Sequence, residues 1–338
     1  MSAVVVFIIF AICLVIAIPI SISLGIVAVL PGAFDTSFTA SAGYVIRSMV
    51  GGIDSFPLLA VPMFVLAGIL MAHGKISEKL FDVFVYFLGN KRAGIPCAVI
   101  ITCLFYGAIS GSAPATVAAV GSMTIPLLIE LGYEKDFSTA IVAVAGGLGV
   151  IIPPSIPFIM YAMATGESVS DLFLAGIVPG LMISALLIFY AYYYCRRHGE
   201  DREKIQEKMD QLKEKGFFNI LKESIWALLS PVIVLGCIYT GVASPTEAAV
   251  ISVFYALILS IFVYKSIGIK EIFNVCVETI RTFAPILFIL ATSVAFSRVL
   301  TLMQVPQIIS EWILNSFSNK VVILLVINLV LLVVGMVM

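Results

Sequence analysis

The sequence predicts an all-α protein that crosses a membrane several times. Three observations lead to this fold class: hydrophobic residues make up 61% of the chain, charged residues only 12%, and the mean hydropathy is +1.15. A soluble domain carries about 25% charged residues, so this chain has too few to cover a water-facing surface. Its apolar runs are also longer than the ~9–11 residues of a transmembrane β-strand.

Charge is concentrated in one segment. Residues 196–223 hold eight basic and seven acidic residues, and the net charge of the whole chain is only −1. The low net charge excludes a basic surface for nucleic acid. Arg196, Arg197, Arg202 and Lys204 crowd the end of the preceding apolar run, so the positive-inside rule predicts a cytoplasmic loop. Its alternating charges favour a solvated helix.

The reactive residues argue against an enzyme or a metal centre. The six cysteines lie in or beside apolar runs without a CxxC pair, and His73 and His198 are the two histidines. We therefore expect free buried thiols and no transition-metal site. No catalytic constellation is evident: there is no HExxH, no paired intramembrane aspartates and no histidine within a predicted span.

The apolar runs set the expected order of spans. Residues 3–30 exceed the ~7–15-residue core of a signal peptide and predict one retained, tilted transmembrane helix. Residues 37–52 are expected at the membrane interface and 56–72 as a short span. Further spans are expected over 171–195, 225–241, 247–265, 272–303 and 321–338. The last run has no polar flank, so we expect more residues beyond it in the complete protein.

Residues 76–89 read as an amphipathic helix. Ile76, Leu80, Val83, Phe84 and Phe87 share one face, opposite the charged side chains. This pattern predicts a helix lying along the membrane. A helix packed on another helix is the alternative.

The chain contains an internal repeat. Residues 56–64 resemble 282–288, and each segment is followed by an amphipathic stretch, an Asn-Lys pair and a long aliphatic run. Such duplication is typical of secondary transporters, which bind substrate between their repeats. Aligning Asn90 with Asn319 gives an offset of 229 residues. The first helix break described below then maps to the end of the chain, so the second repeat is expected to be incomplete here.

The most informative stretch is residues 106–126, YGAISGSAPATVAAVGSMTIP. Small and polar residues interrupt an otherwise apolar run, and Ser112 can cap a new helix with Pro114 in its first turn. This predicts two half-helices meeting inside the membrane, which is tolerated where the backbone lines a cavity. The exposed carbonyls and the hydroxyls of Ser110, Ser112 and Thr116 suit Na⁺, and the new helix N-terminus suits a carboxylate. A small-residue packing interface is the alternative.

A second break is predicted at residues 145–157, which hold three glycines and three prolines. No continuous helix survives that composition; a proline kink in a plain span is the alternative. A third motif, Ser244-Pro245-Thr246-Glu247, predicts a helix start with a capping box. Glu247 facing a polar cavity is its alternative role.

Two charged positions in the last long span also have local explanations. Glu278 and Arg281 are three residues apart and are expected to pair with each other. Arg298 is expected to extend to the membrane interface, with anion binding as the alternative.

Taken in order, three motifs resemble the large membrane subunit of tripartite ATP-independent periplasmic (TRAP) transporters, the DctM-like permeases. They are GAISGSAPATVAAVGSMTIP from Gly107, GGLGVIIPPSIPFIMYA from Gly146 and GVASPTEAA from Gly241. The resemblance covers the whole chain. It implies an inverted-repeat, elevator-type fold with broken helical hairpins, and Na⁺-coupled import of small organic acids.

The resemblance also implies partners and site residues. The partners are a small four-helix membrane subunit and a periplasmic solute-binding protein, in the cytoplasmic (inner) membrane of a bacterium or archaeon. Na⁺ is the coupling ion and no cofactor is expected. The implied ion and substrate residues are Ser110, Gly111, Ser112, Pro114, Thr116, Gly146, Gly147, Gly149, Pro153, Pro154 and Ser155, with Ser244, Pro245 and Glu247 as a structural cap.

The expected division of the chain follows these motifs: 1–93 for scaffold and interfacial helices, 94–170 for the first transport unit with its broken helices, 171–195 for a transmembrane helix, 196–223 for the cytoplasmic loop, 224–265 for transmembrane helices and 266–338 for the start of the second repeat. Two functional alternatives remain: an ion-coupled organic-anion symporter or antiporter that needs no binding protein, and a channel.

Overall fold

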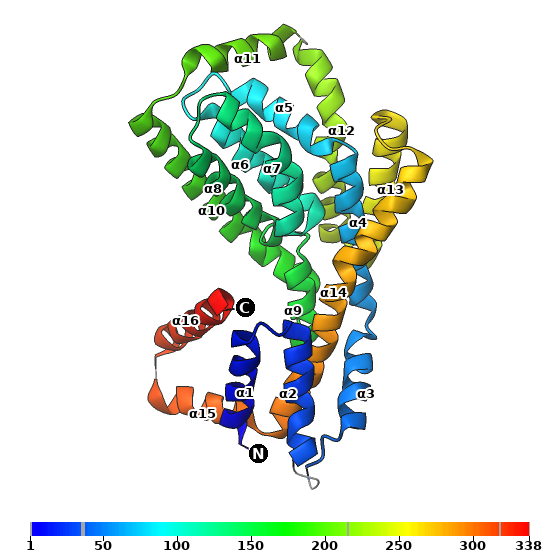
Figure 1. Ribbon diagram of the computed structural model, residues 1–338. Helices are drawn as coiled ribbons and strands as arrows, with labels where there is room; N and C mark the ends of the chain where they lie inside the picture. The colour runs from blue at the N-terminus through cyan, green and yellow to red at the C-terminus, as the bar shows by residue number, and fades with distance from the viewer. Residues whose placement is uncertain (1, 35–37, 215, 318, 338) are drawn as a thin grey trace. The chain divides into compact units, whose positions relative to one another are not determined.

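The computed structural model describes residues 2–34, 38–214, 216–317 and 319–337, and every regular element in these ranges is a helix (Figure 1). Six helical segments of this described part are long and apolar enough to cross a membrane. They are Phe56–His73, Ala113–Glu130, Val169–His198, Phe217–Tyr239, Pro245–Val263 and Lys270–Leu302. The predicted all-α, polytopic membrane fold is confirmed.

The chain forms two compact units. One contains Met1–Asp54 and Pro285–Met338, and the other contains Ser55–Ala284. The helix α14 (Ile269–Leu302) contributes to both, because the boundary at Pro285 falls within it. The functional boundaries expected from the sequence remain a prediction.

The first unit contains α1 (Ala3–Val15), α2 (Ile20–Phe34) and α3 (Ala42–Ile53), and from the other end of the chain the second half of α14, α15 (Val305–Ser316) and α16 (Lys320–Val337). The prediction of one continuous helix over 3–30 was wrong. Pro19 cannot donate a backbone hydrogen bond and disfavours helical geometry at the residue before it. Ala17 turns the chain with a φ of 63°, and α2 begins directly after Pro19. In the predicted interfacial segment 37–52, Ser37 lies outside the described residues and the helix begins at Ala42.

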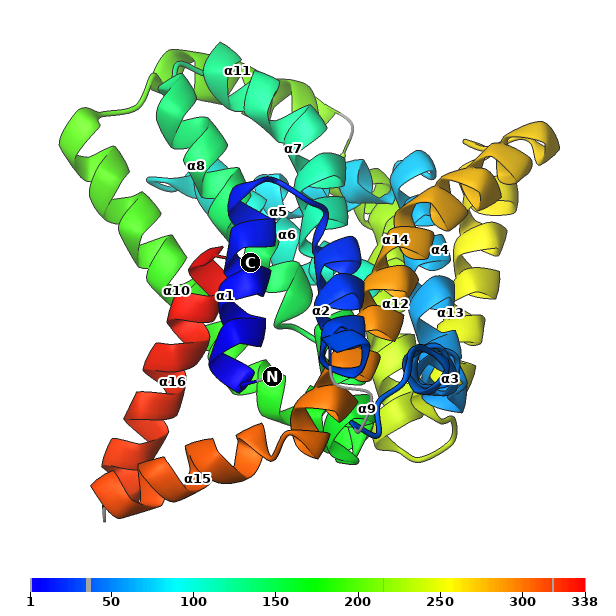
Figure 2. The same ribbon diagram turned by 60° about the horizontal axis from the view of Figure 1, so that its bottom comes forward.

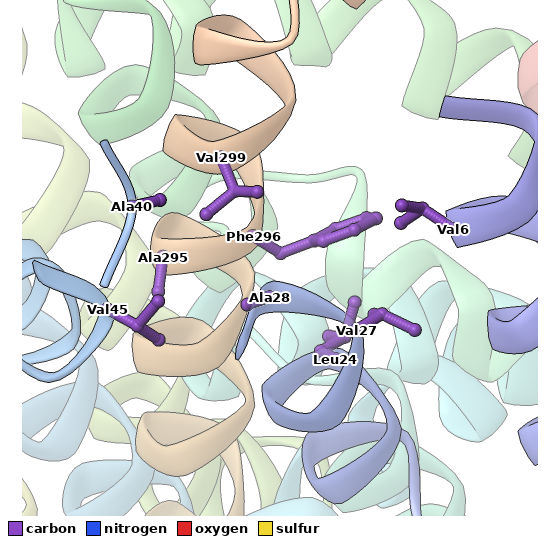
Figure 3. Packing of buried hydrophobic residues seen from close by; sticks show 9 residues of the cluster. All are labelled: Val6, Leu24, Val27, Ala28, Ala40, Val45, Ala295, Phe296 and Val299. Carbon is purple, nitrogen blue, oxygen red and sulfur yellow. The ribbon is translucent and has the colours of Figure 1, made fainter. Parts of the chain in front are cut away.

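A small apolar core holds the first unit together (Figure 3). Phe296 of α14 points toward Val6 of α1, and Leu24, Val27 and Ala28 of α2 lie beside it. Burying side chains of this kind stabilises a fold by about 1.5–3 kcal/mol each in water; within lipid the same contacts act through close packing.

The second unit holds the remaining helices. They are η1 (Phe56–Leu59), α4 (Ala60–His73), α5 (Ile76–Leu88), α6 (Gly94–Ser110), α7 (Ala113–Glu130), α8 (Lys135–Gly146), η2 (Gly147–Val150), α9 (Ile156–Thr165), α10 (Val169–His198), α11 (Arg202–Glu214), α12 (Phe217–Tyr239), α13 (Pro245–Ile258) and η3 (Leu259–Val263). Helix α4 packs against α13, and α6, α7 and α8 pack against one another, as both ribbon views show (Figure 2).

Helix α5 forms where the amphipathic pattern predicts it, but its apolar face is covered by protein. It packs on α6 and α12, burying Ile76, Leu80 and Val83. Phe87, expected on the same face, is 57% exposed. The described contacts therefore fit the alternative, a helix packed on other helices.

The charged segment 196–223 contains the helix that its alternating charges favour, α11 (Arg202–Glu214), but one side of this helix is buried rather than solvated. Helix α10 continues to His198 and α12 begins at Phe217, so the connection is shorter than predicted. Between them, α11 buries Ile205, Met209 and Leu212. Its charges cover only the outer side, because the apolar residues at spacings of three and four form a buried stripe. Lys215 of this segment lies outside the described residues.

The structure repeats its elements at the offset found in the sequence. Lys75 precedes α5 and Gln304 precedes α15, and both have φ 58° and ψ 23°. Positive φ is uncommon for residues other than glycine. His73 and Leu302, the last residues of α4 and α14, are also 229 positions apart. The two segments therefore share the same helix–turn–helix plan.

Candidate functional site

The first helix break lies at Ser110–Ser112 as the sequence predicts. Helix α6 ends at Ser110, and Gly111 has a φ of 62°, the left-handed conformation that glycine adopts without steric cost. Ser112 then caps α7: its hydroxyl accepts from the backbone N–H of Ala115 at 3.5 Å. Pro114 lies in the first turn of α7, where its missing N–H costs nothing.

The second break is formed by the glycine- and proline-rich segment. Helix α8 ends at Gly146, one 3₁₀ turn follows, and the chain leaves helical geometry before Ser155. Ser155 caps α9 by accepting from the N–H of Phe158 at 3.4 Å, and its own hydroxyl donates to the Val150 carbonyl at 2.6 Å. Ser155 is therefore a structural cap with both hydrogen-bonding roles filled.

The two breaks meet in space, backbone against backbone. A Cβ on Gly107 would lie 2.6 Å from the Gly149 Cα, and one on Gly149 would lie 2.9 Å from the Ser112 carbonyl oxygen. The N–H of Ile156 donates to the carbonyl of Gly111 at 3.3 Å. Glycine at these positions permits this close approach. The breaks thus form one locus within the second unit.

A cluster of neutral oxygens occupies this locus. The hydroxyls of Ser110 and Thr116 are 3.0 Å apart, and that of Thr116 donates to the Ser112 carbonyl at 2.9 Å. Ser110 is 1% exposed and Thr116 is fully buried. Hydroxyl and carbonyl oxygens are ligands suited to hard cations. Among the described residues no three His, Cys, Asp or Glu side chains are close enough to hold a metal ion, so a cation here would rest on neutral ligands.

The other residues predicted for the ion and substrate site differ in how deeply they are buried. Gly146, Pro153 and Pro154 are buried in the second break, and the side of Gly147 on which a Cβ would lie is open. Pro114 is exposed.

The third motif forms its capping box at the start of α13. The Ser244 hydroxyl accepts from the Glu247 N–H at 3.3 Å, and the Glu247 carboxylate accepts from the Ser244 N–H at 2.7 Å, with Pro245 in the first turn. Local capping therefore accounts for Glu247.

A cavity of about 290 Å³ lies beside the first break, between α4 and α7. Its wall includes Ala115 in the first turn of α7 and Tyr106, whose hydroxyl donates to the Gly68 carbonyl at 2.9 Å. His73 and Glu278 also line it, and His73 Nε2 lies 3.0 Å from Glu278 Oε2.

This contact corrects the sequence prediction for Glu278. The partner of Glu278 is His73, and the structure shows no ion pair to Arg281 among the described residues. The prediction that no histidine lies in a span overlooked the end of α4, because the helical apolar run Phe56–His73 extends to that residue. Its partner is 205 positions away, so no local pattern could have signalled the pair.

Comparison with known proteins fits this architecture. A sequence profile described as the tripartite ATP-independent periplasmic transporter, DctM component, matches residues 7–338. The chain belongs to the DctM family. The resemblance seen in the three motifs is therefore confirmed.

Relatives with assigned substrates support this membership. The chain is 40% identical over 96% of its length to the isethionate TRAP transporter permease protein DctMQ of Oleidesulfovibrio alaskensis, and 33% identical over 99% to the C4-dicarboxylate TRAP transporter large permease protein DctM of Rhodobacter capsulatus. It is 34% identical over 86% to the sialic acid TRAP transporter large permease protein SiaM of Vibrio cholerae. It spans 50%, 78% and 66% of those proteins respectively.

Proposed function

We propose that this chain belongs to the large permease subunit of a Na⁺-coupled importer of small organic acids. The observation that carries the proposal is the meeting of two broken helices around Ser110, Ser112 and Thr116 in a member of the DctM family. Unwound backbone at membrane depth is tolerated where it lines a binding site, and such sites are typical of secondary transporters.

The chemistry of the site suits an ion and an acid together. The carbonyl end of α6 and the clustered hydroxyls offer oxygens to Na⁺. The N-terminus of α7 offers partial positive charge to a carboxylate. The adjacent cavity of about 290 Å³ gives a small solute space next to that N-terminus.

The substrates of these relatives favour organic anions as a class, since they include isethionate, C4-dicarboxylates and sialic acid. Family membership supports the remaining expectations: a small membrane subunit, a periplasmic solute-binding protein, an elevator-type movement and a place in the cytoplasmic membrane of a bacterium or archaeon. The stand-alone symporter is less well supported, because the relatives named here are TRAP permeases.

Na⁺-dependent thermal stability of the purified chain tests the ion site. A ligand that binds only the folded state, present at a concentration one hundred times its dissociation constant, stabilises that state by about 2.7 kcal/mol. We expect NaCl to raise the unfolding midpoint above that in KCl at equal ionic strength. Ser110→Ala and Thr116→Ala should remove the difference.

Thr139→Ala is the matched control, since Thr139 lies on α8 outside the helix breaks and the cavity, and its hydroxyl donates to the Lys135 carbonyl. This variant should respond to Na⁺ like the unsubstituted chain. Equal midpoints in Na⁺ and K⁺ for the unsubstituted chain would rule out the proposed ion site.

A further inference from the structure

A groove of about 460 Å³ runs between α8 and α10, away from the helix breaks. Its apolar floor comes from both helices: Phe137, Ala140, Ile141 and Val144 of α8, and Leu187 of α10. Val144 is 56% exposed and Tyr190, at the rim, 52% exposed. On a membrane-spanning unit, an apolar channel with such an open side can admit a hydrocarbon chain from the bilayer.

One end of the groove is polar and structurally fixed. The rings of Phe137 and Tyr194 stack at 3.9 Å with an angle of 2°, and Tyr194 stacks on His198 at 4.1 Å. The Tyr194 hydroxyl donates to the Glu134 carboxylate at 2.6 Å. Aromatic side chains with polar tips are typical of the membrane–water interface. The groove therefore has a headgroup end at Glu134 and a hydrocarbon end at Val144.

The length of the groove matches one leaflet. Its lining on α8 extends from Glu134 to Val144, which is about 15 Å at 1.5 Å per residue. Half of a ~30 Å hydrocarbon core is also about 15 Å. Helix α10 spans the membrane and ends beside this polar mouth with Arg196, Arg197 and His198 in its last turn. A single acyl chain thus fits between interface and midplane.

The charged residues at the headgroup end of the groove determine which lipid headgroup it can bind. Glu134 and Asp136 both line it, so a purely anionic headgroup would face two carboxylates. A primary ammonium supplies three N–H donors to them, whereas a quaternary ammonium supplies none. Lys135 lies between the two acids in sequence, and α10 carries Arg196 and Arg197 in its last turn; such cations suit the phosphate of the headgroup.

We infer that the groove between α8 and α10 binds an acyl chain of phosphatidylethanolamine, with the headgroup ammonium at Glu134 and Asp136. This lipid site is separate from the ion site and does not depend on the proposed transport function.

Native mass spectrometry of the purified, delipidated chain, titrated with phosphatidylethanolamine, tests the groove. Ala140→Trp places an indole on the groove floor at an exposed position, and we expect it to weaken lipid binding about tenfold. Ala143→Trp is the matched control, because Ala143 is also exposed on α8 but lies outside the groove. It should bind like the unsubstituted chain. Equal binding by both tryptophan variants would overturn the assignment.

The headgroup is tested separately on the same protein. We expect tighter binding of phosphatidylethanolamine than of phosphatidylcholine or phosphatidylglycerol with identical chains. The double variant Glu134→Gln, Asp136→Asn should lose this preference while still binding lipid, whereas Glu167→Gln should keep it. No headgroup preference in the unsubstituted chain would overturn the proposal.

Discussion

At the scale of single residues, the candidate site depends on the absence of side chains at its glycines. Gly149 faces the hydroxyl of Thr116 and the carbonyl of Ser112, and a Cβ there would lie 2.4 Å from the Thr116 Oγ1. Contacts that close force the Thr116 hydroxyl to turn away or the backbone at Ser112 to shift. The oxygen cluster is therefore sensitive to a single methyl group.

Gly149→Ala should abolish the Na⁺-dependent rise in unfolding midpoint, because it displaces Thr116 from Ser110. Gly236→Ala provides the control: Gly236 lies inside α12, away from the helix breaks, and a Cβ there meets nothing within 4 Å. We expect the Gly236 variant to keep its Na⁺ response, with stability equal to or slightly above that of the unsubstituted chain. A normal Na⁺ response in Gly149→Ala would show that the ion lies elsewhere.

Glu200 is a second sensitive residue, outside the predicted spans. Its side chain is only 2% exposed and accepts from the Tyr133 hydroxyl at 2.7 Å, the Ala93 N–H at 3.0 Å and Arg202 at 2.9 Å. Burial and then the hydrogen bond to Glu200 raise the pKa of Tyr133 above its usual range, so the phenol stays protonated and donates. The carboxylate thereby fastens the start of α6, the α7–α8 connection and the start of α11.

Glu200→Ala should destabilise the chain by about 1–3 kcal/mol, since it leaves buried donors without an acceptor. Unfolding in denaturant would measure the loss. Glu203→Ala, at an exposed position of α11, should change stability by less than about 0.5 kcal/mol. Similar effects of the two substitutions would mean that the hydrogen bonds of Glu200 contribute little.

At the scale of elements, the start of α13 shows how a local motif fixes a helix end. Ser244→Ala should cost about 1 kcal/mol by removing the cap of the Glu247 N–H. Glu247→Gln should cost less, because the amide oxygen can still accept from the Ser244 N–H. Thermal unfolding of both variants checks this order; a larger loss in Glu247→Gln would indicate a role for the carboxylate charge beyond capping.

Helix boundaries were predictable wherever the signal was local. Glycine, proline and a capping serine lie within a few residues of each break, so Ser112 and Ser244 were predicted as helix starts. Ser155 caps α9 in the same way, but it was expected only as a site residue. The break before α2 carries a similar signal at Pro19, but the continuous apolar run outweighed it in the prediction. The partner of Glu278 and the buried position of Glu200 depend on segments far apart in sequence, which periodicity does not report.

At the scale of the whole molecule, the repeat and the topology belong together. Lys75 and Gln304 share one unusual backbone conformation at the predicted offset, so the duplication extends from sequence to structure. Its two copies contribute to different units. Duplicated units with broken helices are typical of carriers rather than channels, which supports the transport proposal over a pore.

The orientation of the chain can be tested across a single helix. Helix α10 runs from Val169 to His198, so the residues just before and just after it should lie on opposite sides of the membrane. The positive-inside rule places the Arg196 end in the cytoplasm. In intact cells a membrane-impermeant maleimide should label Glu167→Cys and fail to label Gln206→Cys, both measured above the background of the six native cysteines. Both positions are exposed, so after cell lysis both should react.

Labelling of Gln206→Cys but not Glu167→Cys in intact cells would reverse the topology. The N-terminus of α7, whose connection to α8 lies on the same side as Glu200, would then point the opposite way across the membrane.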